Sequence, residues 1–197
     1  MKSILCLMGV LLPLASAGQP ADSPKTERVS FEPGGLIRID GSDGTLNVEG
    51  WDRPEVEVTV AGRDQPLVER RSRSELAITA SKQRGDSVNY EIRVPRVSRI
   101  EIHHGTGQVL VADIAGDIQA SAHRGDILLM LPETATYAID AKTKIGVVTS
   151  DFPANLHHRW YLLGERMSGA AAPYQLHLRM GLGGITIKSL PATLSTY

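Results

Sequence analysis

A glycine that returns every nine residues is the feature that most constrains the fold of this chain. Three consecutive segments, GQVLVADIA, GDIQASAHR and GDILLMLPE, each begin with glycine and carry apolar or small residues two and four places later. We expect those residues to face the core: Val109, Val111, Ile118, Ala120, Ile127 and Leu129. The same motif reappears out of phase at Gly44, Gly146 and Gly183. A glycine before each strand supplies a corner where positive φ or close backbone approach excludes a Cβ.

Repeated units of strand and corner predict an all-β domain. Most of the remaining chain alternates apolar and polar residues, and the segment from Glu55 to Val60 places three valines on one face. After residue 17 we find no apolar periodicity of the length that a helix needs. Each repeat unit of a solenoid buries its apolar face against the next, so we expect a single-domain β-helix or solenoid-like stack. An antiparallel β-sandwich with glycine in its turns is the alternative.

The beginning of the chain has the pattern of a cleavable signal peptide. Lys2 is followed by an apolar stretch over residues 4–14 and by Ala15-Ser16-Ala17, which predicts a signal peptide over residues 1–17. The apolar stretch is shorter than the roughly 20 residues that span a bilayer, and no later stretch reaches that length. We therefore expect an exported protein, periplasmic or extracellular, without a transmembrane segment after cleavage.

The remaining chain divides simply. Residues 18–28 are polar and proline-rich and predict a flexible linker, residues 29–190 form the β-repeat domain, and residues 191–197 form a C-terminal tail.

The net charge is -1, with acidic and basic residues interspersed, so no nucleic-acid surface is expected. The only cysteine, Cys6, lies in the leader, which excludes a thiol nucleophile and a thiolate metal site from the mature chain.

Several stretches together resemble a bacterial family of exported or membrane-tethered, adhesin-like β-repeat domains. They include GTLNVEGWDRPEVEV, VADIAGDIQASAHRGDILLMLP and GLGGITIKSL, and the resemblance runs from about Leu36 to Leu190. It implies a β-helix-like fold associated with the bacterial envelope and brings no catalytic residues. The stretches 62–75 and 153–173 depart from the regular pattern.

Candidate chemical groups are scattered through the repeats. Four aspartates near segment ends, Asp113, Asp117, Asp126 and Asp151, fit an acid and base for glycan cleavage, but aspartate after glycine also caps turns. His104 and His123 are close to one repeat apart and are expected to stack only if the repeat aligns them; surface histidines are favoured over a metal site. Asp40-Gly41-Ser42-Asp43-Gly44 is interpreted as a plain turn rather than a calcium loop. We expect no metal, cofactor or catalytic residue.

The irregular segment from Phe152 to Tyr174 is the candidate binding loop. His157, Arg159, Trp160 and Tyr161 gather there, and aromatic side chains with polar tips stack on sugars or anchor protein partners. A cap over the end of the core is the alternative. The sequence therefore favours a non-catalytic envelope protein that binds a glycan or a protein or serves as a scaffold, with self-association through exposed end strands. The alternative is a polysaccharide-acting enzyme.

Overall fold

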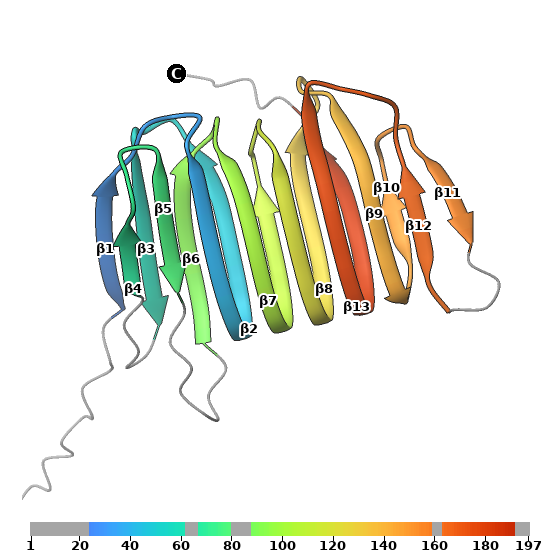
Figure 1. Ribbon diagram of the computed structural model, residues 1–197, viewed down its shortest axis with the longest axis horizontal. Helices are drawn as coiled ribbons and strands as arrows, with labels where there is room; N and C mark the ends of the chain where they lie inside the picture. The colour runs from blue at the N-terminus through green and yellow to red at the C-terminus, as the bar shows by residue number, and fades with distance from the viewer. Residues whose placement is uncertain (1–23, 62–66, 80–87, 159–162, 192–197) are drawn as a thin grey trace, which may run out of the picture.

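The computed structural model describes residues 24–61, 67–79, 88–158 and 163–191, and within them every regular element is a β-strand (Figure 1). The strands are β1 (Lys25–Ser30), β2 (Leu36–Trp51), β3 (Glu55–Ala61), β4 (Leu67–Arg70), β5 (Glu75–Thr79), β6 (Val88–Pro95), β7 (Arg99–Ala112), β8 (Ile118–Pro132), β9 (Tyr137–Ile145), β10 (Val148–Ser150), β11 (Asn155–His158), β12 (Glu165–Ser168) and β13 (Tyr174–Leu190). The prediction of an all-β chain is confirmed.

Four long strands, β2, β7, β8 and β13, lie parallel in the centre of the molecule, and a column of glycines crosses them. Gly44, Gly107, Gly125 and Gly183 are direct neighbours in the register of successive strands, and all have φ between 118° and 135°. A Cβ on Gly107, Gly125 or Gly183 would lie 1.7–1.9 Å from the carbonyl oxygen of the preceding glycine in the column. Both conditions exclude any other residue.

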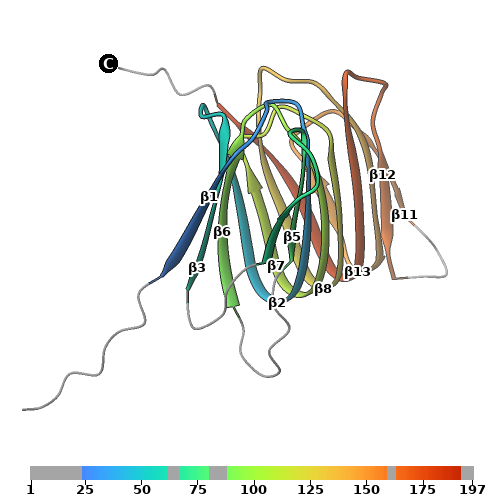
Figure 2. The same cartoon turned by 60° about the vertical axis from the view of Figure 1, so that its left-hand side comes forward.

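The glycine column bends the sheet into two layers that face each other (Figures 1 and 2). The first half of β2 pairs with β5 and its second half pairs with β6, so one strand continues from one layer into the other. At the opposite end, β13 pairs first with β9 and then with β10. The glycines therefore lie inside bent strands, whereas the sequence pattern placed them before separate short strands.

The apolar positions of the repeat fill the space between the layers. Each of the six predicted core residues is at most 1% exposed: Val109, Val111, Ile118, Ala120, Ile127 and Leu129. Val56, Val58 and Val60 on β3 are equally buried. The predicted core positions of these segments are confirmed, and the core is continuous from the β3 end to the β9 end.

The structural repeat is twice as long as the interval between glycines. Gly107 aligns with Gly125, 18 residues later, and Ile100 aligns with Ile118. Gly116 belongs to a different corner, before β8, where a Cβ would lie 2.0 Å from the carbonyl oxygen of Ser98. Each nine-residue segment thus supplies one layer, and two segments complete a unit.

Antiparallel strands occupy both ends of the molecule. The described strands form one mixed sheet, in which β1, β3 and β6 pair antiparallel at one end and β9, β12 and β11 at the other. The sheet does not close on itself. Its two facing layers resemble those of a sandwich, which is the alternative predicted from the sequence. Its central strands are parallel, however, so the antiparallel pairing of that alternative is found only at the ends. The pairing does not establish a β-helix.

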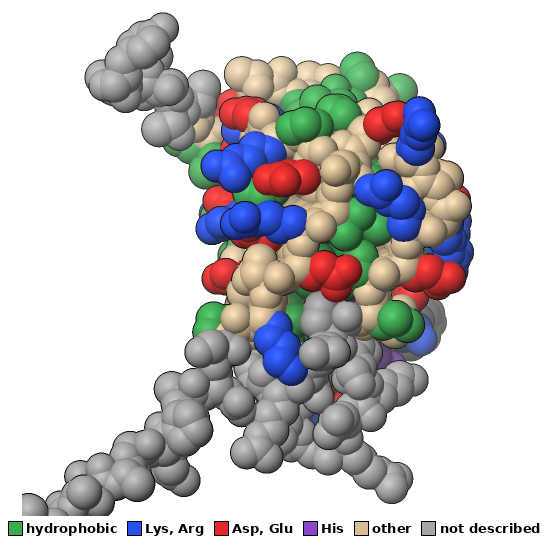
Figure 3. All heavy atoms as spheres, turned by 90° about the vertical axis from the view of Figure 1, so that its left-hand side faces the viewer, with side chains coloured by type: hydrophobic (Ala, Val, Ile, Leu, Met, Phe, Trp, Pro, Cys, Tyr) green, Lys and Arg blue, Asp and Glu red, His purple; other side chains and the backbone are tan. Residues whose placement is uncertain are grey.

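The N-terminal boundary differs from the expected one. β1 begins at Lys25, so residues 25–28 of the segment predicted as linker pair with β3. The β1 end mixes both signs of charge on its surface (Figure 3), where Arg28 forms an ion pair with Glu57 at 2.5 Å. The hydrogen bond and charge of Arg28 hold the pKa of Glu57 below its ordinary value. The predicted signal peptide lies outside the described residues.

Candidate functional site

A row of basic side chains crosses the outward face of the sheet at its C-terminal end. Arg179 on β13 is the register neighbour of Lys142 on β9, which neighbours Arg166 on β12, which neighbours His157 on β11. We call these four residues the basic row. Residues on either side of them in sequence, such as Leu178, Met180 and Ala141, are buried, so alternation turns the row outward. With strands about 4.8 Å apart, the row extends over about 15 Å.

One carboxylate, that of Asp140, pairs with two members of the basic row. Asp140 accepts a hydrogen bond from Arg179 Nη2 at 2.5 Å, lies 3.2 Å from His177 Nδ1 and is 3.6 Å from Arg166 Nε. Partial burial by itself would raise the pKa of Asp140, but the hydrogen bond and charge of Arg179, with His177 and Arg166, lower it below its ordinary value. Asp140 is therefore a fixed negative charge at neutral pH and does not act as a proton donor.

A small hollow opens on the other side of the row. It has a volume of about 190 Å³ and is lined by Ser121, Ala122, His123, Lys142, Lys144, Arg179, Met180 and Gly181. Gly181 leaves its part of the lining without a side chain, and a Cβ there would lie 2.3 Å from the His123 carbonyl oxygen. The lining holds three permanent cations and no carboxylate. It is smaller than the roughly 300 Å³ of a pocket for a whole small molecule, and suits a single anionic group.

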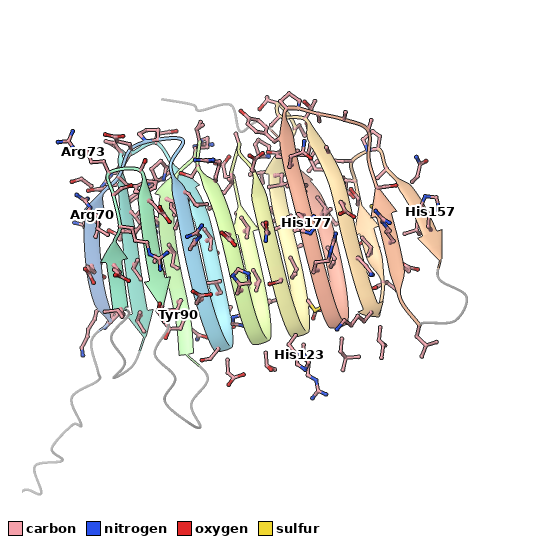
Figure 4. The ribbon with its side chains drawn as sticks, in the orientation of Figure 1. Arg70, Arg73, Tyr90, His123, His157 and His177 are labelled. Atoms are coloured by element: carbon pink, nitrogen blue, oxygen red, sulfur yellow. The ribbon has the colours of Figure 1, made fainter. Side chains whose placement is uncertain are left out.

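Two of these cations have no acidic partner in the described part of the chain. Arg179 is bound to Asp140, whereas neither Lys142 nor Lys144 forms an ion pair with a carboxylate of residues 24–61, 67–79, 88–158 or 163–191. His123 lies at the lower end of β8 and His177 higher on β13 (Figure 4). The hollow thus offers unneutralised positive charge, which attracts phosphate, carboxylate or sulfate groups.

The residues predicted from the irregular segment are only partly described. His157 is exposed on β11 and ends the basic row, while Arg159, Trp160 and Tyr161 lie outside the described residues. Sequence reasoning missed Lys142, Arg166 and Arg179. A signal for two of them was present, because YAIDAKTKI and LHLRM alternate apolar residues with charged or histidine side chains on one face.

The described histidines do not gather at one place in the fold. His104 is 7% exposed and its Nε2 lies 3.2 Å from the Gly44 carbonyl oxygen, while its register neighbour on β8 is Ala122 rather than His123. The repeat therefore does not align His104 with His123, and His104 is buried rather than at the surface as expected. Within the described residues, no three His, Cys, Asp or Glu side chains converge as metal ligands.

Three of the four candidate aspartates accept hydrogen bonds from the backbone, and the fourth forms an ion pair. Asp117 accepts a hydrogen bond from the Gln175 N–H at 2.9 Å, and Asp126 accepts one from the Gly184 N–H at 3.0 Å. Asp151 lies 3.3 Å from both Lys188 Nζ and the Ser189 N–H, and Asp113 forms an ion pair with Arg96. Three of the four therefore bond to the backbone of a distant strand rather than capping their own turn. The stretch Asp40–Gly44 lies inside β2, so the predicted plain turn is a bend within a strand.

A second hollow lies near the β1 end. Its volume is about 470 Å³, and its lining includes Phe31, Pro33, Pro54, Arg70 and Arg73. Arg70 donates to the Ser30 carbonyl oxygen, and Arg73 accepts at its own carbonyl from the Glu32 N–H at 3.4 Å. Both residues are labelled at the β1 end of the molecule in Figure 4, and Arg70 is the last residue of β4. These bonds attach the β4–β5 hairpin to the end of β1 and the loop after it, which gives the Arg70 side chain a structural role.

Comparison with known proteins gives a fold. No protein-family model and no curated protein matches the chain. A crystal structure of a protein from Clostridium sporogenes ATCC 15579, named a "putative cell adhesion protein", matches 85% of this chain and 100% of its own at 13% identity, with a TM-score of 0.52. A "putative adhesin" from Parabacteroides distasonis ATCC 8503 matches 87% of this chain and 68% of its own at 15% identity, with a TM-score of 0.30.

None of the described residues forms a helix that is long and apolar enough to cross a membrane. At 13% identity the likeness to the Clostridium protein shows a shared fold. The chain therefore has the fold of a bacterial protein named for cell adhesion, which agrees at this level with the adhesin-like resemblance of its sequence.

Proposed function

We propose that this chain is a non-catalytic, adhesin-like binding protein of the bacterial envelope, and that its basic row holds acidic groups of an envelope polymer. The outward face of β8, β13, β9 and β12 is a regular surface of neighbouring strands. The repeated strand spacing places cations at regular intervals, which suits a polymer with repeated anionic groups.

The unpaired lysines around the 190 Å³ hollow carry this proposal. Lys142 and Lys144 border it with Arg179, and its lining contains no carboxylate. A solvated lysine that is not neutralised costs little by itself, but Lys142 and Lys144 repel each other across one hollow, and Asp140 offsets only the charge of Arg179. An acidic group of a ligand would neutralise that repulsion.

The aspartates favour binding over catalysis. A glycosidase needs one carboxylic acid with a raised pKa and a second carboxylate facing it across the sugar. Asp117 and Asp126 instead accept backbone hydrogen bonds, and Asp140 is held ionised by Arg179. The polysaccharide-acting enzyme stays the alternative, and sugar release is the readout that distinguishes it.

The proposal includes the finer features predicted from the sequence. We propose that the 18-residue units of β7 and β8 belong to a solenoid-like stack that includes β2 and β13, with the antiparallel strands as its caps. Export to the periplasm or cell exterior follows from the predicted signal peptide over residues 1–17, and self-association through the end strands is proposed because β1 and β11 end the strand order of the described part of the chain.

The test is binding of the chain without residues 1–17 to immobilised polygalacturonate, an acidic glycan, and to dextran, a neutral one. We expect binding to polygalacturonate only, weaker in 0.5 M NaCl, and a loss of about tenfold in affinity for Lys142→Gln combined with Lys144→Gln. Lys188→Gln is the matched control, because Lys188 is paired with Asp151 outside the hollow. Equal binding of polygalacturonate by the Lys142→Gln, Lys144→Gln double variant and by the Lys188→Gln control would refute the assigned site.

Two further outcomes separate the alternatives. Loss of binding in Trp160→Ala or Tyr161→Ala, with the lysine variants unaffected, would place the contact on the aromatic segment predicted from the sequence. Release of reducing sugar ends from polygalacturonate by the wild-type chain, abolished by Asp126→Asn, would establish the enzyme instead.

A further inference from the structure

Exposed apolar side chains gather at one corner of the molecule, where the two layers meet. Leu182 is 40% exposed, Ile145 47%, Val147 57% and Leu163 84%. Leu182 and Ile145 are register neighbours on β13 and β9. The Gly146 N–H donates to the Leu163 carbonyl oxygen at 2.8 Å, which places Leu163 beside the link between Ile145 and Val147. We call these four residues the apolar corner.

The bend makes this corner project from the molecule. Gly146 and Gly183 have φ of 134° and 135°, and each lies next to a residue of the apolar corner in sequence. Side chains just before a bend point away from both layers, so the core does not cover them. The bends run along the lower edge of the molecule in Figure 1.

The chemistry of that edge changes along the sheet. Register neighbours at the bend, read from β2 through β7, β8 and β13 to β9, are Asp43, Thr106, Arg124, Leu182 and Ile145. The edge therefore passes from an acidic residue through a polar and a basic one to two apolar ones. Only its β8–β9 end combines apolar side chains with cations.

Cations surround the apolar corner. Arg124 is the register neighbour of Leu182, Lys144 precedes Ile145, and Lys142 lies two residues before Lys144 on the same strand. Across the described ranges of the chain, no carboxylate forms an ion pair with any of these three. The nearby carboxylates have other partners: Asp140 is bound to Arg179. Glu165 accepts a hydrogen bond from the Val148 N–H at 2.8 Å, and Asp126 accepts one from the Gly184 N–H at 3.0 Å.

We infer that the apolar corner docks this protein onto the surface of an anionic phospholipid membrane. Projecting aliphatic side chains insert into the boundary between headgroups and acyl chains, and a collar of lysine and arginine attracts anionic headgroups at the same depth. Charge complementarity selects a membrane over a second copy of this chain, because two such corners would bring Arg124, Lys142 and Lys144 of both copies together. The apolar corner adjoins the proposed glycan site and shares Lys142 and Lys144 with it, but its four aliphatic side chains are not part of that site.

The test is co-sedimentation of the chain without residues 1–17 with sucrose-loaded vesicles. We expect binding to vesicles of phosphatidylglycerol and phosphatidylcholine at equal amounts, and at least about tenfold weaker binding to pure phosphatidylcholine. Ile145→Ser combined with Leu182→Ser should weaken binding to the anionic vesicles at least about tenfold, because aliphatic area no longer leaves water. Arg124→Gln should weaken it severalfold and only at low salt.

Val97→Ser is the matched control, since Val97 is also an exposed aliphatic residue, at 50%. It lies away from the bend, because its carbonyl oxygen accepts a hydrogen bond from the Gly34 N–H in the loop before β2. Circular dichroism establishes that each variant is folded. The apolar double variant should bind polygalacturonate as the wild type does, so failure of this inference and failure of the proposed function are separable. Equal binding to both kinds of vesicle, or unchanged binding of the apolar double variant, would overturn the inference. A dimer in light scattering that Ile145→Ser and Leu182→Ser dissociate would overturn it in favour of a second copy.

Discussion

A Cβ on Gly125 would lie 1.8 Å from the carbonyl oxygen of Gly107, on the neighbouring long strand. Gly125 also has φ of 120°, a backbone conformation that is essentially restricted to glycine. We expect Gly125→Ala to lower the free energy of unfolding by at least about 3 kcal/mol, because strain and collision act together. Urea denaturation followed by circular dichroism measures the change.

Gly34→Ala separates the two contributions. Gly34 has φ of 81°, but nothing lies within 4 Å of the Cβ that alanine would add. This variant should lose only about 1 to 2 kcal/mol, the cost of the backbone conformation. A Gly125→Ala protein as stable as Gly34→Ala would show that the glycine column is not required for the bend.

The Asp126 carboxylate should contribute to stability and not to chemistry. Its hydrogen bond to the Gly184 N–H joins β8 to β13 across 58 residues of sequence. Asp126→Ala should lower the free energy of unfolding by about 1 kcal/mol, measured by thermal denaturation. Asp43→Ala is the control, since Asp43 is exposed on β2 and no hydrogen bond or ion pair to it is present among the described residues. Equal stability of the two variants would contradict the assigned role.

The apolar pattern predicted the layers but not how they connect. Val109, Ile118 and Ile127 follow glycine at fixed places, and burying such alternating residues requires strands. The sequence interval of nine residues did not reveal the 18-residue unit, because Gly116 and Gly125 look alike although one precedes a strand and the other bends one. Only the pairing of Gly107 with Gly125 distinguishes them.

The candidate site depends on pairings that a local pattern does not contain. Lys142 meets Arg179 because β9 pairs in parallel with β13, and it meets Arg166 because β12 folds back on β9. These contacts join residues up to 37 positions apart, so the aromatic segment, which is conspicuous locally, drew the sequence-based prediction instead. His157 is the one predicted residue that the described structure places in the basic row.

Thr143 should stabilise the corner that carries the apolar residues. Its buried hydroxyl donates to the Gly146 carbonyl oxygen at 2.9 Å and accepts from the Glu165 N–H at 2.9 Å. Thr143→Val keeps the shape but leaves both backbone groups without this partner, so it should cost about 1 to 3 kcal/mol by urea denaturation. Thr149→Val removes an exposed hydroxyl whose one hydrogen bond among the described residues is to Thr186, so it should change stability by less than about 0.5 kcal/mol.

The ion pairs of Asp140 predict a specific acid dependence of stability. Arg179, His177 and Arg166 hold the folded-state pKa of Asp140 below the ordinary value of 3.8. A group whose folded pKa is depressed stabilises the fold above its unfolded pKa, and that contribution disappears as the pH falls through the folded pKa. We expect wild type to be more stable than Asp140→Asn at pH 6, and the difference to shrink as the pH falls below about 4.

Arg179→Gln provides the control for this assignment, because it removes the strongest interaction of Asp140 and leaves the carboxylate. Its loss of stability at pH 6 should overlap with that of Asp140→Asn, so that the double variant is little worse than either single one. Urea denaturation at pH 3, 4 and 6 measures all four proteins. A stability difference between wild type and Asp140→Asn that stays constant from pH 6 to pH 3 would contradict the assignment, since a carboxylate that is protonated can no longer attract the three cations.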